Sequence, residues 1–268
     1  ITEATENSHL EILAHELLDI VGPRLTGTPQ MRNAHDWAVQ RYADWGINAK
    51  IHEWGEWNGW ERGITHIDMI SPRVRTLSGI QLGYSPSTSL KGVTGALDVI
   101  PEVKNKDEFN AWLKTIKGKF ILSSMYQITG RPDYNWEEYA TPESFKKMKE
   151  TRIEATRKWN SNFRKMGINR RQISKILEDA GAIGLLSSNW AGGFGANRIF
   201  STGTKTIPHL DIELEDYSML YRMVESGSGP EIRVVSTSKD LGIVPTFNTL
   251  AEICLLYTSP SPRDPKIS

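Results

Sequence analysis

The residues best suited to metal chemistry are six histidines scattered along the chain: His9, His15, His35, His52, His66 and His209. His15 and Glu16 begin the H-E-x-x-H pattern, which places two zinc ligands on one helix face. Residue 19 is aspartate, however, so the second histidine of that pattern is missing. A solvent-exposed helix face is therefore the favoured interpretation of His15 and Glu16.

Three of the other histidines give weaker signals. His52 and His66 lie on two predicted strands that could pair and bring them face to face. Two histidines alone bind a metal weakly, so ordinary packing is favoured for both. His209, in the sequence Ile-Pro-His-Leu-Asp-Ile, is predicted to be a strand residue near a loop.

Nucleophilic and phosphate-binding motifs are also missing. The chain has no G-x-S-x-G elbow, and its single cysteine, Cys254, lies in a Ser/Pro-rich tail and leaves no disulfide within the chain. The glycines of residues 190–197 hint at a phosphate-cradling loop, but their spacing is not G-x-G-x-x-G and no helical pattern follows. A mobile surface loop is predicted there. The sequence thus predicts no catalytic, cofactor-binding or metal-binding residue in this chain.

A basic stretch raises the alternative of an anionic partner. Residues 146–175 hold eleven Lys/Arg against two Asp/Glu. Trp159 and Phe163 stand four residues apart, which is the spacing of a helix core rather than of a base-stacking platform. We therefore favour a solvated helix face without nucleic acid binding. Salt-dependent binding to DNA would be the signature of the alternative.

Three tryptophans recur at every third residue around two glycines. Trp54, Trp57 and Trp60 surround Gly55 and Gly59. Tryptophans so placed could stack on sugars. Burial under the first domain is the favoured interpretation, because the glycines allow a tight, wrapped loop.

Length and composition indicate a globular protein of one large or two modest domains. The chain has 268 residues, 38% hydrophobic and 24% charged, with a formal net charge of +0. A neutral chain has no overall bias toward nucleic acid or anionic membranes. No apolar run reaches the roughly 18 residues of a membrane span.

The first 71 residues predict two helices followed by two strands. Apolar residues at helical spacing run from His9 to Val21. Thr28-Pro29 is typical of a helix N-terminus, and Gly46 of a left-handed C-terminal cap. Two strand-like segments follow, Ala49–Trp54 and Gly63–Ile70, joined by a loop rich in Gly and Trp.

From Ser71-Pro72 onward the pattern changes to short strands that alternate with Gly and Pro. The predicted strands are Val93–Val99, Lys119–Ser124, Ile183–Ser187 and Glu231–Thr237, with helices at Arg170–Ala180, Glu215–Glu225 and about 142–166. This alternation of short strands with Gly and Pro predicts a second, β-rich module. From Asp240 the pattern resembles a return to the first module, because Phe247–Ile253 is strand-like and would belong to a sheet begun earlier.

The order of short motifs resembles the secreted two-zinc exopeptidases of the carboxypeptidase Q type. The most specific part is DIVGPRLTGT at 19–28, followed by Pro29-x-Met31-Arg32-x-Ala34-His35-x-Trp37-Ala38 and Trp45-Gly46. The similarity continues through EWGEW at 53–57, Gly59-Trp60 and Ser71-Pro72-Arg73. GVTG at 92–95, KGKFIL at 117–122, GAIGLL at 181–186, Ile207-Pro208 and Glu215-Asp216-Tyr217 resemble the protease-associated (PA) domain inserted in that family. FNTLAEI at 247–253 is similar to the strand that re-enters the peptidase domain.

The resemblance implies an α/β fold: an incomplete zinc-exopeptidase α/β domain with an inserted β-rich PA domain. It assigns 1–71 to the first part of the peptidase domain, 72–239 to the inserted domain with a basic helical excursion at about 142–166, and 240–253 to the re-entry strand. In that family the zinc ligands follow the re-entry strand, beginning with a Gly-His-x-Asp-Ser segment. No such segment follows Ile253 here, so the resemblance carries no ligand onto any residue of this sequence.

The resemblance also implies what the intact parent protein does. Two zinc ions would share a water molecule, lower its pKa and polarise the scissile carbonyl of a peptide or dipeptide, while a carboxylate takes the proton. The inserted domain would flank the cleft, and the parent would be periplasmic or extracellular. This chain is expected to bind no zinc and to be inactive as a peptidase. The alternative is a non-catalytic PA module that acts as a protein-interaction or lid unit. The oligomeric state stays open.

The last fifteen residues, 254–268, do not fit the preceding pattern. Residues 254–264, CLLYTSPSPRD, resemble the translation of a transposase adapter used to prepare DNA libraries. Residues 265–268 would then be index sequence. Our hypothesis is that 254–268 is not natural protein. The alternative is a genuine disordered C-terminus.

Overall fold

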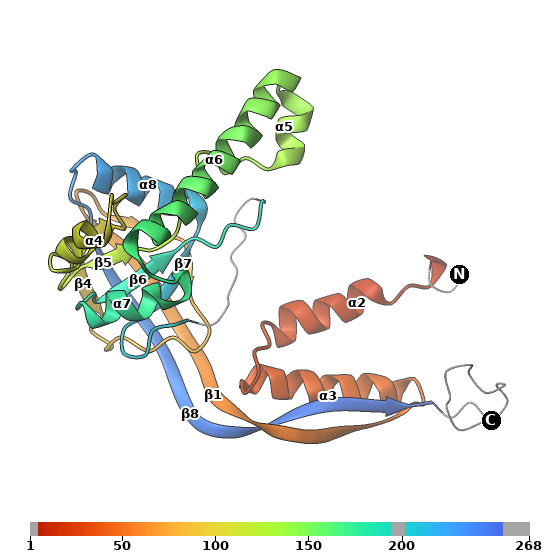
Figure 1. Ribbon diagram of the computed structural model, residues 1–268. Helices are drawn as coiled ribbons and strands as arrows, with labels where there is room; N and C mark the ends of the chain where they lie inside the picture. Colours follow the sequence, from red (N-terminus) through yellow and green to blue (C-terminus); the bar gives the residue numbers. More distant parts are fainter. Residues whose placement is uncertain (1–4, 194–201, 254–268) are drawn as a thin grey trace, which may run out of the picture. The chain divides into compact units, whose positions relative to one another are not determined.

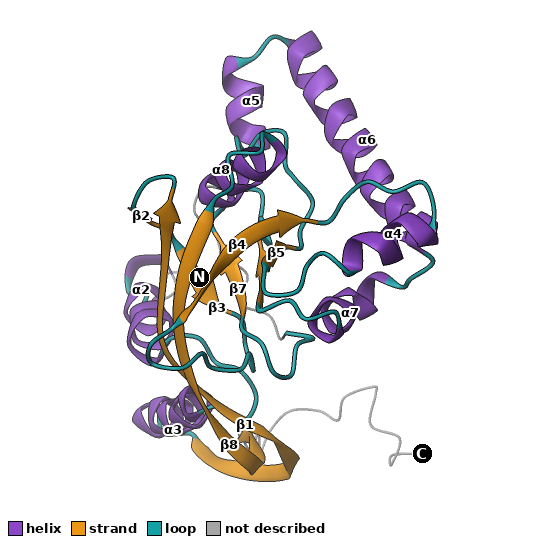
Figure 2. Ribbon diagram, turned by 90° about the vertical axis from the view of Figure 1, so that its left-hand side faces the viewer, coloured by secondary structure: helices purple, strands orange, loops and turns teal. Residues whose placement is uncertain are grey.

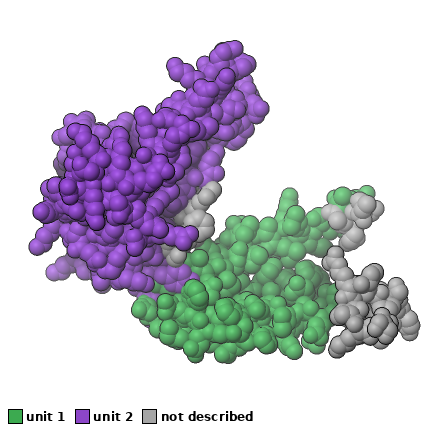
Figure 3. All heavy atoms as spheres, viewed as in Figure 1, with its two compact units in different colours: residues 1–61, 240–268 green, residues 62–239 purple. Residues whose placement is uncertain are grey.

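The computed structural model describes residues 5–193 and 202–253. The chain divides into two compact units, residues 1–61 with 240–268 (unit 1) and residues 62–239 (unit 2) (Figure 3). The elements in chain order are α2 (Leu10–Ala14), the π-helix η1 (His15–Val21), α3 (Pro29–Asp44), β1 (Asn48–Ser71), β2 (Arg75–Thr76), β3 (Gly79–Gln81), β4 (Val93–Val99), α4 (Lys106–Leu113), β5 (Phe120–Leu122), α5 (Asp133–Tyr139), α6 (Pro142–Met166), the 3-10 helix η2 (Arg170–Gln172), α7 (Ile173–Asp179), β6 (Gly184–Ser187), β7 (His209–Ile212), α8 (Leu214–Glu225) and β8 (Glu231–Glu252).

The helices of unit 1 form where the sequence predicts them. The Thr28 hydroxyl caps α3 by accepting a hydrogen bond from the Met31 N–H, and Pro29 occupies the first turn. Gly46 follows the helix with φ of 72°, the left-handed conformation that glycine adopts without strain. The predicted helix from His9 to Val21 is present, but its second part, η1, is a π-helix.

The predicted strand segments are confirmed, but the loop predicted between two of them is wrong. Ala49–Trp54 and Gly63–Ile70 are parts of β1, with no loop between them. The predicted strand Phe247–Ile253 is the end of β8, which stops at Glu252 and neighbours β1 in the sheet. The glycines that suggested a loop accommodate β8 instead. A Cβ atom on Gly59 would lie 2.6 Å from the Val244 side chain, and one on Gly63 would lie 2.1 Å from the Thr237 hydroxyl.

The sheet of unit 2 closes on itself. The strand order is β2-β1-β8-β4-β5-β6-β7-β3, and β4 to β7 run parallel. The first and last strands of that order, β2 and β3, belong to one short segment, residues 75–81. This segment pairs with β1 at one end and with β7 at the other. It therefore joins the two ends of the sheet around an apolar interior.

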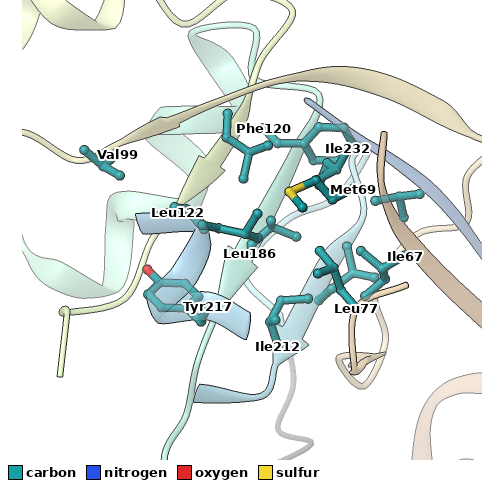
Figure 4. Packing of buried hydrophobic residues seen from close by; sticks show 14 residues of the cluster. Ile67, Met69, Leu77, Val99, Phe120, Leu122, Leu186, Ile212, Tyr217 and Ile232 are labelled. Atoms are coloured by element: carbon teal, nitrogen blue, oxygen red, sulfur yellow. The ribbon is translucent and has the colours of Figure 1, made fainter. Parts of the chain in front are cut away.

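Strand alternation divides the core of unit 2 between two faces. Phe120 and Leu122 of β5 point to an inner cluster, whereas Ile121 between them joins an outer cluster. The inner cluster also receives Tyr217 and Leu220 from α8, and Figure 4 shows its side chains packed together. Helices α4, α6 and α7 supply the outer cluster (Figure 2).

Helix α6 runs beyond this core. Its C-terminal part buries Phe163 and Met166. Its N-terminal part packs with α5 away from the sheet (Figure 1). Trp159 and Phe163 stack edge to face at 5.2 Å in the outer cluster, which confirms helix-core spacing for this pair. Arg152 and Arg157 form ion pairs with Asp133 and Glu154, so the basic face is partly neutralised.

The predicted α/β class is confirmed as a mixed sheet with helices on its faces. The identity of unit 2 as a PA domain stays a prediction, as does the assignment of residues 254–268, which lie outside the described residues. None of the described helices combines the length and apolarity needed to cross a bilayer.

Candidate functional site

Unit 1 contains a largely apolar groove of about 500 Å³. Its walls come from the segment before α3, the first turns of that helix, Trp54 of β1 and residues 241–248 of β8. The apolar side chains that line it include Pro29, Met31, Leu241, Val244 and Phe247. The groove thus combines the most specific motif of the sequence with the strand that returns to unit 1.

Gly27 fixes the chain where it enters the groove. Its φ is 73°, and a Cβ atom there would lie 2.7 Å from the backbone oxygen of Asn58. The Gly27 carbonyl accepts a hydrogen bond from the Trp60 N–H at 3.2 Å. Only glycine combines this conformation with so close an approach of two backbones.

The first turns of α3 hold polar side chains over β8. One ring nitrogen of His35 (Nδ1) lies 2.9 Å from the Thr249 hydroxyl, and the ring meets Phe247 edge-on at 6.4 Å. The Arg32 guanidinium lies 4.8 Å from the centre of the Phe247 ring and also pairs with Asp36. The groove therefore combines apolar walls with the half-exposed Arg32 guanidinium.

The π-helix packs against α3 through a polar contact. The Trp37 ring N–H donates to the Glu16 carboxylate at 2.7 Å. Arg24 donates to the carbonyls of Leu17 and Gly22, which closes the end of η1. Residues 22–37, part of the motif that resembles the exopeptidase family, therefore hold η1 against α3. They supply no obvious reacting group.

The structure separates the histidines. His15 is exposed and pairs with Asp19 at 2.8 Å, which confirms the exposed helix face. His52 and His66 lie on the same strand, β1, fourteen residues apart, so the prediction that they face each other on paired strands is wrong. His209 begins β7, which confirms the strand assignment, and it is buried.

The histidine and acidic side chains of residues 5–193 and 202–253 are dispersed. In these segments no group of three or more His, Cys, Asp or Glu side chains could hold a metal ion. The described side chains therefore do not fit a two-zinc centre. The location of the ligands stays a prediction.

The tryptophan prediction holds for one residue of three. Trp60 is 5% exposed, whereas Trp54 and Trp57 are 52% and 48% exposed on β1. The predicted loop is part of β1 and so does not wrap over the three rings.

A buried polar network lies at the carboxyl ends of the parallel strands in unit 2. The Asp211 carboxylate accepts hydrogen bonds from the backbone and side-chain N–H groups of Asn189 at 2.8 and 2.7 Å. The Tyr217 hydroxyl donates to the Ser124 carbonyl and accepts from its N–H. Burial raises the pKa of Tyr217, so the phenol stays protonated. The sequence carries no local signal for this network, because its members are distant along the chain.

His209 is a neutral side chain in the same unit. Burial lowers the pKa of His209 to about 4. Its Nδ1 atom lies 2.9 Å from the Thr202 hydroxyl, and its backbone N–H donates to the Ser85 hydroxyl. Within the described residues the other ring nitrogen has no hydrogen-bond partner. This environment favours a packed core histidine over a metal ligand.

Glu178 secures the segment that precedes β7. Its carboxylate accepts from the backbone N–H groups of Lys205, Thr206 and Ile207. Burial alone would raise the pKa of Glu178, but these hydrogen bonds outweigh burial and lower it. The contact is structural. The predicted loop at 190–197 lies largely outside the described residues, as does Cys254.

Comparison with known proteins identifies relatives that match most of the chain. No family model matches it. Mouse carboxypeptidase Q is 24% identical over 237 residues, and human carboxypeptidase Q is 24% identical over 241 residues. Both matches cover 88% of this chain. The chain is related to carboxypeptidase Q. The predicted resemblance is thereby confirmed.

The match covers 44% of each carboxypeptidase Q, so the chain spans less than half the length of these relatives. Among solved structures, a peptidase M28 precursor from Shewanella amazonensis aligns with TM-score 0.58 at 18% identity, covering 92% of this chain and 50% of that one. BSAP, a zinc aminopeptidase from Bacillus subtilis, aligns with TM-score 0.51 at 16% identity, covering 91% and 46%. At this identity the two structures show a shared fold.

Proposed function

We propose that the chain is part of a zinc-dependent exopeptidase that removes residues from peptides or dipeptides. The observation that carries this proposal is the match to carboxypeptidase Q along 88% of the chain but only 44% of the relative. The BSAP structure, that of a zinc aminopeptidase, supports zinc as the cofactor of the full-length protein. Two zinc ions in that protein are part of the proposal. In this proposal the zinc ligands lie on polypeptide that follows β8.

The two units then have different roles. Unit 1 supplies the first helices of the peptidase domain and the ribbon of β1 and β8, while an inserted PA domain, residues 72–239, flanks the cleft. Such an insertion agrees with a unit that has its own closed sheet and core. Peptides are the proposed substrates. The periplasm or extracellular space is the proposed location, and fractionating the source cells with an antibody against unit 2 tests it.

The DNA that follows the source locus is the decisive observation. We expect a continuous reading frame that departs from the present sequence at about residue 254. It should encode a Gly-His-x-Asp-Ser segment and then paired acidic residues. A genomic stop codon directly after Ser268 would refute the proposal.

Activity of the purified chain gives a second test. We expect no zinc-dependent release of an amino acid from a dipeptide by residues 1–268, and release by the extended protein with zinc. Loss of the extended protein's activity with a chelator, and recovery with zinc, is the control. Hydrolysis by the short chain itself would contradict the proposed position of the ligands.

The alternative is a non-catalytic PA module that binds or covers a partner. The self-contained core of unit 2 favours it, because that unit has the packing of an independent domain. The same locus separates the two functions: a frame without metal-binding segments favours the module. Filter binding at low and high salt tests the remaining alternative, an anion-binding α6, for which we expect no DNA retention.

A further inference from the structure

Helix α5 and the first turns of α6 form an arm that projects from the sheet of unit 2 (Figure 1). Arg152 of α6 joins the two helices of this arm. Its guanidinium pairs with Asp133 at the start of α5 and donates to the carbonyls of Thr129 and Arg131. The outer faces of the two helices therefore hold a fixed arrangement relative to each other.

Charge is segregated between the two helices. Residues 133–166 hold eight Lys/Arg and six Asp/Glu, so the region as a whole is nearly balanced. Helix α5 carries three of the acidic residues and no basic one, whereas α6 carries all eight basic residues. Asp133 of α5 pairs with Arg152, but Glu137 and Glu138 are exposed and form no ion pair among the described residues. The arm thus presents an acidic helix beside a basic one.

The exposed face of α6 is basic around an isoleucine. Lys146, Lys149 and Ile153 follow one another at intervals of three and four residues, so they share one face of the helix. Ile153 is 60% exposed. The Lys149 ammonium lies 4.0 Å from the centre of the Phe145 ring, and the Lys146 ammonium lies 4.0 Å from the Glu150 carboxylate. Both lysines are exposed, so these contacts leave them accessible to a partner.

The exposed face of α5 is the counterpart of this basic face. Tyr134 is 62% exposed, and Glu137 and Glu138 follow it by three and four residues, so the three side chains share a face. Each of the two faces therefore has one exposed apolar side chain beside two charges, and the charges of the two faces have opposite sign. Within one copy no ion pair among the described residues links these carboxylates to the lysines of the basic face.

The charge arrangement selects a second copy of the chain as the partner. A polyanion would meet the carboxylates of α5 as well as the lysines of α6, so the nearly balanced arm offers it little net attraction. A second copy presents the same two faces, and a two-fold axis brings each face onto its opposite. We propose that α5 of one copy docks on the face of α6 that holds Lys146, Lys149 and Ile153 in a second copy, and the reverse. The contact lies within unit 2, so it goes beyond the proposed function and is independent of where the zinc ligands lie.

Sedimentation equilibrium of the 268-residue chain tests the contact. We expect the average mass to rise with protein concentration from 30.2 kDa toward twice that value. Because salt screens exposed ion pairs, the association should be stronger in about 50 mM salt than in about 1 M salt. A chain that stays at 30.2 kDa at every concentration and at both salt concentrations would overturn the proposal.

Two reversed-charge variants test which faces meet. The first variant combines Glu137→Lys with Glu138→Lys, and the second combines Lys146→Glu with Lys149→Glu. We expect the dissociation constant of each variant alone to rise at least about tenfold, because like charges then meet at both contacts. An equimolar mixture of the two variants should dimerise again, since each contact then joins opposite charges. Lys91→Glu, at an exposed lysine of unit 2 outside the arm, is the control and should associate like the original chain.

The mixture also separates loss of contact from loss of fold, because it contains the same two variants, and circular dichroism of each variant provides a second check. Association that persists in both variants would place the contact elsewhere in the chain and overturn the proposal. A mixture of folded variants that is no more dimeric than either variant alone would overturn it as well. The zinc ligands take no part in these measurements, so each of these failures leaves the proposed function standing.

Discussion

The two units differ in how they bury apolar side chains. Among the described residues, unit 1 buries only Ala34 and Trp60 of this kind, and four apolar residues of its first helices, Leu10, Ile12, Leu18 and Ile20, are exposed. Unit 2 has two buried clusters, one inside its closed sheet and one under its helices. Because apolar burial is the main favourable term in folding, unit 2 can stabilise itself, whereas unit 1 depends on further contacts.

The largest expected effect compares two leucines. Leu186→Ala in the inner cluster of unit 2 should cost about 2–5 kcal/mol, because it leaves a cavity in a fully buried core. Leu18→Ala in unit 1 should change the free energy of unfolding by less than about 0.5 kcal/mol, since Leu18 is 59% exposed. Urea unfolding followed by circular dichroism measures both. Equal losses would erase the contrast between the units.

Acid should weaken unit 2 through His209. The folded-state pKa of His209, about 4, lies below the ordinary histidine pKa of about 6.5, so the unfolded chain binds the proton first. Stability is thus complete above about pH 6.5 and falls as the pH drops toward 4, by about 3 kcal/mol. Urea unfolding between pH 7 and 4 measures this decline. His209→Gln should flatten it, and His15→Gln, at an exposed residue of unit 1, should leave it unchanged.

The Tyr217 hydroxyl should matter less than these core contacts. Tyr217→Phe removes its two hydrogen bonds with the Ser124 backbone and leaves the N–H of Ser124 without this partner. We expect a loss of about 1–2 kcal/mol in the free energy of unfolding. Tyr134→Phe, at a residue 62% exposed in the same unit, is the control and should be neutral. Thermal unfolding of both variants provides the measurement. An unchanged stability of Tyr217→Phe would show that the two hydrogen bonds with Ser124 do not stabilise the fold.

The smallest effect compares two helix caps with the same Thr-Pro sequence. Thr28 caps α3 in unit 1 and also donates to the Leu25 carbonyl, and its side chain is buried. Thr141 caps α6 in unit 2 and is exposed. We expect Thr28→Ala to cost about 1 kcal/mol and Thr141→Ala about 0.5 kcal/mol. Helix content on urea titration distinguishes them, and a larger loss at Thr141 would reverse the expected order.

Local chemistry made the helices predictable from the sequence. Thr28-Pro29 and Gly46 bound α3, and Pro142 and Gly167 bound α6 in the same manner. Each signal acts within a few residues of the chain. The helical spacing of Trp159 and Phe163 was likewise sufficient to indicate the face that packs.

Long-range pairing accounts for what the sequence did not reveal. The glycines of β1 suggested a loop because the side chains that require them, Val244 and Thr237, lie about 180 residues away. The groove has the same origin, since residues 26–35 and 241–248 meet only after β1 and β8 pair. The network of Asp211 and Asn189 similarly unites two different strand ends.

The paired strands bring both ends of unit 2 to the same place. The backbone N–H of Ile64 donates to the Thr237 hydroxyl at 3.0 Å, so the chain enters and leaves this unit side by side. A module with adjacent ends can be cut out and replaced by a short hairpin, or transplanted into another hairpin, without stretching the host. Residues 62–239 thus form a natural cassette for grafting, and for exchange between genes during evolution.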